Sequence, residues 1–460
     1  MTSTTETHPA GDPVLALRAG LDGALTLPGD NGWELAARAW NLSVAQRPRA
    51  VLAARVAADV VTAVRFARDH SLQISAQPSG HGATGALDET ILIRTAAFDD
   101  VWIDADARVA RVGSGVTWAQ LQSELDGTGL TGLIGSSPDV TVVGSCLGGG
   151  LSWLSRPFGT GASSLRAVEL VDASGRHRWV SDDKDPELMW ALRGGGGDFG
   201  IVTAVELDLF PAPRITGGRL VFPAEQAAQV LRAFTAVTSL APDTLSLWAA
   251  VMHFPPLPFL PEEIRGRSFC FVDAVHVGGR DELATLLAPV RQAGTVLRET
   301  VRPLRPSEIG TVCEEPAEPS PATHTAMGLS VVDDEVIDRI LRLAGPGTGT
   351  PLTQVQIRHL GAALRRPVAG AAGRIDAEYL VSALAMLPEP TLAGPVAAAM
   401  TQLREAMAPW DAGPTVLSML GPHEEVTAAF DEPTLARLRR VKATVDPSGV
   451  IRGNYPLAGK

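Results

Sequence analysis

Apolar positions recur with a helical period in some parts of this chain and alternate with polar positions in others. Residues 57–70 (AADVVTAVRFARDH) carry apolar side chains at helical spacing, with Asp59 near the start and basic residues toward the end. Short apolar runs at 51–54 and 72–76 flank this segment. A strand, a helix and a second strand in this order predict a small α/β layer near the start of the chain.

Short strands separated by turn residues dominate the stretch that follows. The spacing predicts helices at 117–126 and 185–192, the first opened by Thr117 and Gln120 in a capping pattern. A Ser-Gly pair within 172–175 predicts the turn of a hairpin. The strands that we expect here lie at 90–94, 100–104, 107–113, 164–171, 178–180 and 201–209.

Two prolines in FPAPR, residues 210–214, mark a domain boundary. Strands and helices alternate from about 215 to 405, which predicts an antiparallel sheet with helices on one face, an α+β arrangement. The predicted strands lie at 218–222, 245–253, 268–277, 353–360 and 379–385, and the predicted helices at 224–240, 280–294, 333–343, 395–407 and 433–442.

Composition and charge narrow the classes of protein. Hydrophobic residues make up 45% of the chain and charged residues 20%, which is typical of a folded globular protein. The formal net charge of −12 disfavours binding to nucleic acids or anionic membranes. We find neither a long apolar membrane span nor the basic and apolar segments of a signal peptide. Cys146, Cys270 and Cys313 show no metal-binding spacing and suggest no disulfide framework, so we expect a cytoplasmic protein without a bound metal.

Three glycine-rich stretches lie in the first half of the chain, at 77–85, 135–150 and 193–200. Glycine lets a backbone approach a ligand closely, and successive N–H groups in such turns form anion-binding nests. The third stretch contains G-x-G-x-x-G, but it follows a helix and precedes a strand, the reverse of the dinucleotide-binding order. A phosphate-bearing ligand along these loops is one explanation, and close backbone packing among small residues is the other.

Four motifs in order resemble those of the FAD-linked oxidoreductases of the berberine bridge enzyme type, in the vanillyl-alcohol oxidase-like superfamily. The family's R-x-G-G-H-x-x-x-G is similar to QPSGHGATG at 77–85, and its G-x-C-P-x-V-x-x-x-G-x-x-x-G-G-G to GSSPDVTVVGSCLGGG at 135–150. WALRGGGGDFG at 190–200 is similar to W-A-x-R-G-G-G-G-x-F-G, and DPSGVIRGN at 446–454 to D-P-x-x-x-x-R-x-N.

The resemblance, which is clear over about 45–212 and 435–456, implies a two-part α+β fold. An FAD-binding module of the PCMH type would comprise residues 1–212, with its core at about 45–212, joined by a C-terminal segment, residues 431–460. A substrate-binding module, residues 213–430, would cover the flavin with an antiparallel sheet and its helices.

The resemblance also implies how the cofactor is held. The imidazole of His81 would bond covalently to the 8α-methyl group of FAD, and backbone N–H groups of the first loop would wrap the pyrophosphate. Glycines 148–150 and 195–197 are expected to face the cofactor. The residues that we expect to contact FAD are Gln77, Pro78, Ser79, Gly80, His81, Gly82, Ala83, Ser137, Thr141, Gly144, Gly148, Gly149, Gly150, Gly200, Val202 and Asn454.

The sequence departs from the family pattern at three places. Ser137 stands where the family has a second covalent anchor, a cysteine, so we expect attachment through His81 only. A serine hydroxyl supplies almost no anion to attack the ring. Val416 and Leu435 occupy stretches in which the family often places a tyrosine base. Gln77 replaces the usual arginine of the first loop, which removes a charge near the phosphates.

The resemblance implies an FAD-dependent oxidase or dehydrogenase. The flavin would take a hydride from a carbon next to oxygen or nitrogen in a small organic substrate, such as a secondary metabolite, and O2 would reoxidise it. One alternative is a flavin-containing cyclase or isomerase without net redox change, which the missing tyrosine favours, and a flavoprotein without catalytic activity is another. An apolar block at 254–260 would suit a bulky apolar substrate, whereas Trp248 is expected in the core.

A catalytic base must then come from the strands of the substrate module. Side chains alternate along a strand, so only one residue of each neighbouring pair faces the flavin. We expect Tyr379 and Arg358 to point toward the cavity, with Glu378 and His359 pointing away. Arg358 would favour the phenolate of Tyr379 and lower a pKa that is normally near about 10. The alternative is that Tyr379 is an ordinary packed strand residue.

Overall fold

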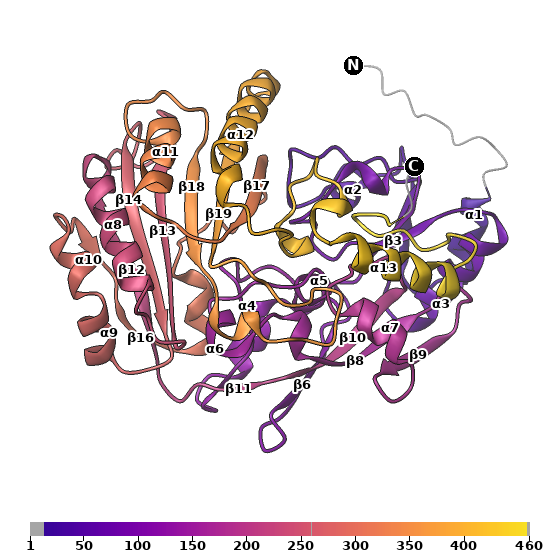
Figure 1. Ribbon diagram of the computed structural model, residues 1–460. Helices are drawn as coiled ribbons and strands as arrows, with labels where there is room; N and C mark the ends of the chain where they lie inside the picture. Colours follow the sequence, from indigo (N-terminus) through magenta and orange to yellow (C-terminus); the bar gives the residue numbers. More distant parts are fainter. Residues whose placement is uncertain (1–12, 259, 458–460) are drawn as a thin grey trace.

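The chain folds into an N-terminal part and a C-terminal part that lie side by side, and the end of the chain returns to the first part (Figure 1). The computed structural model describes residues 13–258 and 260–457. Each part has its own sheets, and the main core of the N-terminal part extends to Trp248 and Val275 of the C-terminal part, which has a further core of its own.

A four-stranded sheet opens the N-terminal part. Its strands are β1 (Ala24–Thr26), β2 (Ala50–Ala53), β3 (Ile74–Ala76) and β4 (Ile91–Arg94), flanked by helices α1 (Val14–Leu17) and α2 (Trp33–Ala37). The order is β1-β2-β4-β3, with β2 and β3 both parallel to β4. Helix α3 (Ala57–Asp69) connects β2 to β3, so the predicted strand, helix and strand are all present.

A second, antiparallel sheet lies next in sequence, in the order β5-β6-β10-β8-β9. These strands are β5 (Val101–Asp104), β6 (Val109–Gly113), β8 (Leu165–Val171), β9 (His177–Ser181) and β10 (Ile201–Asp208). Two further strands, β7 (Leu130–Thr131) and β11 (Phe210–Pro211), form a short antiparallel pair. The helices of this part that follow β6 are α4 (Trp118–Glu124), α5 (Val142–Leu147), α6 (Ser155–Phe158) and α7 (Pro186–Leu192). The predicted capping pair at the start of α4 is formed, because Thr117 and Gln120 each accept a backbone N–H from the other.

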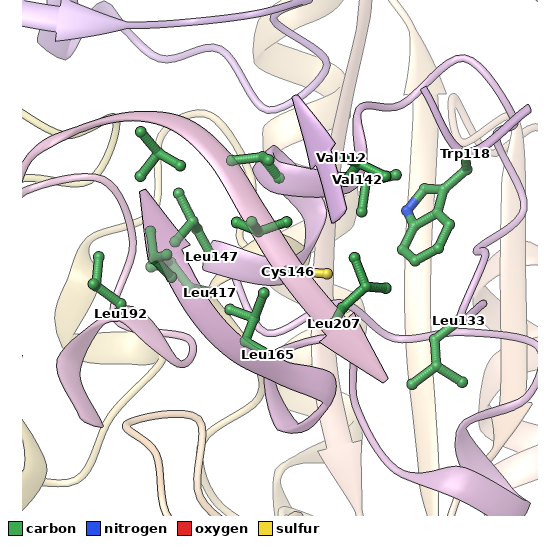
Figure 2. Close-up of a cluster of buried hydrophobic side chains, with 14 of the residues drawn as sticks. Val112, Trp118, Leu133, Val142, Cys146, Leu147, Leu165, Leu192, Leu207 and Leu417 are labelled. Carbon is green, nitrogen blue, oxygen red and sulfur yellow. The ribbon is translucent and has the colours of Figure 1, made fainter. Parts of the chain in front are cut away.

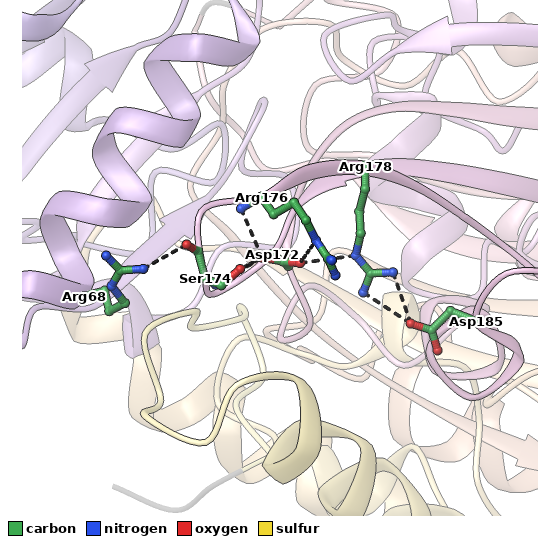
Figure 3. Close-up of polar contacts among 6 residues, drawn as sticks. All are labelled: Arg68, Asp172, Ser174, Arg176, Arg178 and Asp185. Carbon is green, nitrogen blue, oxygen red and sulfur yellow. Dashed lines mark hydrogen bonds and ion pairs between the residues drawn. The ribbon is translucent and has the colours of Figure 1, made fainter.

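One carboxylate holds the turn between β8 and β9 (Figure 3). Asp172 Oδ1 accepts hydrogen bonds from the backbone N–H of Ser174 at 3.1 Å and from its hydroxyl at 2.6 Å. Arg178 bridges Asp172 and Asp185, with nitrogen–oxygen distances of 3.2 Å to each, and Asp185 is the N-cap of α7. Arg68 of α3 donates to the carbonyl of Ser174 at 2.9 Å. The predicted turn is thus fixed to two neighbouring helices.

The core of the N-terminal part packs α5 between the second sheet and the following loops (Figure 2). Cys146 of α5 is fully buried there among leucine and valine side chains. The three cysteines are free, and burial raises the pKa of both the Cys146 and the Cys270 thiol to about 12. The thiols therefore pack as small apolar groups.

An eight-stranded antiparallel sheet forms the C-terminal part, in the order β15-β12-β14-β13-β18-β19-β17, with β16 also paired to β12. The strands are β12 (Ile215–Pro223), β13 (Leu245–His253), β14 (Ser268–His276), β15 (Arg298–Glu299), β16 (Arg302–Leu304), β17 (Ala322–Leu329), β18 (Gln354–His359) and β19 (Tyr379–Met386). The helices α8 (Ala227–Thr238), α9 (Arg280–Leu286), α10 (Ala288–Gln292), α11 (Asp334–Ala344) and α12 (Ala393–Met407) share one core with this sheet. The α+β arrangement, an antiparallel sheet covered by helices, is confirmed.

The C-terminal segment returns to the first sheet after helix α13 (Glu432–Val445). Asp446 fixes the turn, because its carboxylate accepts hydrogen bonds from the backbone N–H groups of Val450 at 2.9 Å and Ile451 at 2.8 Å. Lys442 lies 2.7 Å from the same carboxylate. Ile451 then forms a parallel bridge with Ile74 of β3.

Candidate active site

A cavity of about 1860 Å³ lies between the glycine loops of the N-terminal part and one face of the eight-stranded sheet. It brings together nearly all the residues expected to contact the cofactor. Those that line it are Gln77, Pro78, Ser79, Gly80, His81, Gly82, Ala83, Ser137, Thr141, Gly144, Gly148, Gly150, Gly200, Val202 and Asn454. The sheet contributes Arg219, Val221, Met252, Phe269, Phe271, Gln354, Gln356, Arg358, Ser382 and Leu384.

Gly149 is the exception among the expected cofactor residues. A Cβ on Gly149 would lie 2.7 Å from the Cβ of Val416, and its φ of +102° is one that side chains with a Cβ rarely adopt. A Cβ on Gly195 would lie 2.6 Å from Leu438 Cδ2. An added side chain at either position would meet these protein groups, so the expectation that both positions face the cofactor stays a prediction. The close-packing explanation holds for them.

His81 lies in the first loop and is held on three sides. The Trp40 ring stacks on the imidazole with centroids 4.2 Å apart. Nδ1 lies 2.9 Å from the Ser79 hydroxyl, and Nε2 lies 3.1 Å from Asp139 Oδ2. Although burial alone would raise the pKa of Asp139, its hydrogen bond and charge interaction with His81 contribute to a net lowering. A carboxylate only accepts, so in a neutral imidazole the ring proton lies on Nε2, and Nδ1 accepts from the Ser79 hydroxyl.

The first loop also has a positive charge behind it, although Gln77 replaces the family's arginine. Arg94 of β4 donates through Nη1 to the backbone carbonyl of Gln77 at 2.9 Å and to its side-chain oxygen at 2.8 Å. Burial lowers the pKa of Arg94 to about 10, so the guanidinium remains charged at neutral pH. Arg94 therefore restores a cation beside the loop.

Buried polar atoms around the loops fit a polar ligand such as FAD. Cavity-lining side chains that carry a buried polar atom with no hydrogen-bond partner among the described residues include Gln77, Thr95, Ser114 and Trp118. Such groups are costly to bury alone and are usually satisfied. A Cβ on Gly82 or Gly197 would meet open space, with no described atom closer than 3.9 Å, so the protein itself does not fill these positions.

The C-terminal segment holds the first loop in place. Asn454 Oδ1 accepts from the backbone N–H of Thr84 at 3.2 Å, and its backbone carbonyl accepts from the Thr84 hydroxyl at 2.6 Å. Its amide nitrogen donates to the carbonyl of Gly82. Asp198 of the third loop accepts from the backbone N–H of Gly453, within the fourth motif, and from that of Leu457 at 2.6 Å. The fourth motif thus positions the first and the third.

Tyr379 does not lie in the cavity, and that expectation is wrong. Cross-strand neighbours share a face, and Tyr379 pairs with His359, whereas Arg358 pairs with Leu380. Tyr379 packs beneath α8, with its hydroxyl 2.7 Å from Thr238 Oγ1. Burial raises the pKa of its phenol, although Thr238 and a nearby arginine oppose the rise. The tyrosine is an ordinary packed strand residue.

Arg358 does line the cavity, and Glu378 and His359 lie outside it, as expected. The Arg358 guanidinium carbon lies 4.0 Å from the centroid of the Trp248 ring. Trp248 is buried, as expected, and stacks on Trp153 of the N-terminal part with centroids 3.5 Å apart. The two parts of the chain therefore meet directly beside Arg358.

Comparisons with known proteins agree with this geometry. The FAD binding domain family matches residues 48–181. (R)-6-hydroxynicotine oxidase of Paenarthrobacter nicotinovorans is 30% identical over 62% of this chain and 62% of its own length. An uncharacterized FAD-linked oxidoreductase of Bacillus subtilis (strain 168) is 27% identical over 94% of this chain and 97% of its own. The solved structure of Physcomitrella patens BBE-like 1 matches with a TM-score of 0.85 at 19% identity, covering 98% of this chain and 100% of that one.

The chain is similar to FAD-linked oxidoreductases, and its fold is that of the berberine bridge enzyme-like type. The enzyme carries the family's fold with the departures noted in its sequence. Ser137, at the position of the second anchor, donates through its hydroxyl to Glu315 Oε2 at 2.9 Å and so links the two parts of the chain.

Some residues in or beside the candidate site were not anticipated from the sequence. Asp139 is the carboxylate within GSSPDVTVVGSCLGGG, and a lone carboxylate in a glycine loop was the signal available. Trp40 and Gln356 carried no comparable signal. The apolar block at 254–260 contributes Phe254, Leu257 and Leu260 to the cavity, while residue 259 lies outside the described residues.

No group of three or more His, Cys, Asp or Glu side chains suited to a metal ion is found within residues 13–258 and 260–457. Over the same residues, every helix is too short or too polar to cross a bilayer.

Proposed function

We propose that the enzyme is an FAD-dependent oxidase or dehydrogenase that acts on a carbon next to oxygen or nitrogen in a small organic substrate. The observation that carries this proposal is a single cavity lined both by the three glycine loops and by an apolar and cationic sheet face. When bound, FAD supplies the hydride acceptor, and we propose O2 as the oxidant that restores it. The nicotine oxidase relative, an oxidase by name, supports this reaction class.

The proposed division of labour follows the two parts of the chain. Residues 1–212 with the segment 431–460 form the proposed FAD-binding module, and residues 213–430 the proposed substrate module. The return of Ile451 to Ile74 supports this division, as does the confinement of the eight-stranded sheet to residues 215–386.

We propose that His81 is the only covalent anchor. Its tautomer, fixed by Asp139, leaves the Nδ1 lone pair toward Ser79, and a nucleophilic ring nitrogen is what the attachment requires. Ser137 cannot act as the family's cysteine does. Protein precipitated with acid should therefore keep its yellow colour, and the FAD mass should lie on one peptide that contains His81. Flavin released into the supernatant would contradict the covalent bond.

The cyclase or isomerase alternative rests on the lack of a tyrosine hydroxyl free to act as a base, although Tyr455 itself lines the cavity. Of the two tyrosines in the sequence, Tyr379 lies beneath a helix, and the Tyr455 hydroxyl donates to the carbonyls of Leu420 at 2.7 Å and Gly421 at 3.0 Å. Burial also raises the pKa of Tyr455, so the phenol is a poor proton acceptor.

Anaerobic mixing with candidate substrates separates the two functions. An oxidase or dehydrogenase should lose its flavin absorbance with the true substrate and should form a product two electrons more oxidised. Turnover to a product of the same oxidation level, with the flavin still yellow, would support the cyclase or isomerase and overturn the oxidase.

A further inference from the structure

Arg358 lines the cavity, and its guanidinium is held by two neighbouring side chains. Its Nε donates to Gln356 Oε1 at 2.7 Å, and its plane lies over Trp248. Among the described residues, it has no ion pair within 4.0 Å and no hydrogen bond from Nη1 or Nη2. Gln356 is buried, and Trp248 is wedged against Trp153. The cation is therefore fixed before any ligand arrives, which reduces the entropy lost on binding.

The carboxylates nearest to Arg358 are engaged elsewhere. Asp273 accepts hydrogen bonds from Nε and Nη2 of Arg219, at 2.6 and 2.8 Å. Both residues lie in the cross-strand row that contains Trp248. Glu315 accepts the Ser137 hydroxyl and is exposed. Burial lowers the pKa of Arg358, and these acidic groups raise it only in part, so the charge is incompletely compensated.

The cavity changes character along the strands. Trp248 of β13 and Arg358 of β18 are cross-strand neighbours. Because Trp248 stacks on Trp153 of the N-terminal part, this pair lies at the end of the cavity nearest that part, which we call the inner end. Four residues further along β13, Met252 pairs with Phe269, and the apolar 254–260 segment borders that row. The inner end thus carries Arg358, whereas the outer end is mainly apolar, with Arg267 lying over the Phe269 ring.

We propose that Arg358 binds a carboxylate of the substrate, and that the substrate is a small organic acid with an apolar body. A planar guanidinium with two free nitrogens matches a carboxylate in a bidentate arrangement. The apolar body would lie along Met252, Phe269 and the 254–260 segment. This proposal rests on the proposed function, because it names the substrate class of the same site.

The FAD-loaded enzyme can be tested with one matched pair of probes, naphthalene-2-carboxylate and naphthalene-2-carboxamide. These share an apolar body and differ in charge. Binding is followed by calorimetry and by the change in flavin absorbance. We expect the wild-type enzyme to bind the carboxylate at least tenfold more tightly than the carboxamide.

Two substitutions assign that preference to the side chain. Arg358→Met should weaken carboxylate binding at least tenfold and should change carboxamide binding less than twofold. The carboxylate affinity of Arg358→Lys should lie between those of the wild type and Arg358→Met, because an ammonium keeps the charge without the planar guanidinium. Arg232→Met removes the same charge from α8, where Arg232 pairs with Asp334 and Asp338, and should leave both affinities unchanged.

Each other outcome overturns the proposal. Equal wild-type affinity for the two probes excludes a carboxylate site, and an unchanged preference in Arg358→Met places the site elsewhere. Loss of bound flavin in Arg358→Met, with its fold retained, would assign Arg358 to the cofactor instead. If the Met variant does not fold, the wild-type ratio and the Lys variant decide. The proposed function is tested independently: it fails if the purified wild-type chain does not bind FAD. In that case calorimetry with the two probes on the same chain would still test carboxylate binding by Arg358.

Discussion

At the level of single residues, one carboxylate determines the protonation pattern of His81. In a neutral imidazole, Asp139 accepts a hydrogen bond from the Nε2–H group, so the Ser79 hydroxyl must donate to Nδ1. Neutral asparagine would remove this constraint, because its side chain offers either an oxygen or an N–H₂ group to the ring.

Asp139→Asn should therefore slow covalent attachment while leaving non-covalent binding largely intact. We expect the fraction of FAD retained after acid precipitation to fall at least fivefold in freshly reconstituted protein, with total bound FAD within about twofold of wild type. Asp106→Asn, in an exposed turn of the same part, is the matched control. Equal rates of attachment in the Asp139 and Asp106 variants would remove Asp139 from this role.

His359, outside the cavity, shows how burial keeps a histidine neutral. Arg156 donates through Nη1 to His359 Nε2 at 3.0 Å, and Arg365 and Glu378 pair beside it. Burial first, and then the charges of Arg156 and Arg365, lower the pKa of His359 to about 3. The unfolded chain would take up this proton below about pH 6.5. The folded state is then penalised as the pH falls from about 6.5 toward 3.

His359→Gln keeps an acceptor for Arg156 without a titrating ring. Wild type should be the more stable protein at pH 7.5, and its advantage should shrink by about 1.4 kcal/mol at pH 5.5. Urea unfolding midpoints at the two pH values measure the change. The exposed His70, substituted in the same way, is the matched control. A constant advantage across this range would mean that His359 is protonated in the folded enzyme.

At the level of elements, strands with apolar runs were well predicted, whereas their facing was not. Residues 245–253 and 268–276 form strands within one residue of the predicted bounds. β17 was missed because ATHTAMGL has few β-branched or large apolar residues. The side of the sheet to which Tyr379 points could not be predicted from YLVSALAM, because β19 is largely buried on both faces. Only its pairing with β18 sets the register.

The glycine loops separate into packing positions and cavity positions only in three dimensions. Gly149 and Gly195 abut Val416 and Leu438, so substitutions there would disturb the protein whether or not a cofactor binds. Gly197 lines the cavity, its Cβ direction is open, and its φ is not in the left-handed region. A substitution at Gly197 therefore tests ligand contact without a clash inside the protein.

Gly197→Val should fold with a thermal midpoint close to that of the FAD-free wild type, but should retain less than a tenth of the FAD. Gly394→Val is the matched control, because no atom lies within 4 Å of its added Cβ on the exposed start of α12. Gly294 would not serve as a control, since its Cβ would lie 2.6 Å from Gln226 Oε1. Full FAD content in the Gly197 variant would return this loop to a purely structural role.

At the level of the whole molecule, the motifs located the site, but the sequence did not show how its parts are joined. The Trp153–Trp248 stack and the Ser137–Glu315 hydrogen bond connect the two parts, and each joins residues about a hundred or more positions apart. The C-terminal segment is tied down by Asp198, the acidic residue of RGGGGDFG. Such pairs follow no local pattern of apolar and polar positions, so sequence periodicity could not reveal them.

Asp198→Asn should loosen the returning segment from the third loop. Asp198 accepts backbone N–H groups from both Gly453 and Leu457, and an asparagine would turn an N–H₂ group toward one of them. A buried donor left without its acceptor costs about 1–3 kcal/mol, so a lower thermal midpoint and faster proteolysis after residue 445 are expected. Because Asn454 then holds the first loop less firmly, FAD loading should also fall. Asp183→Asn, on the exposed turn before α7, should change neither property, and a wild-type midpoint in Asp198→Asn would show that the segment is held by its other contacts alone.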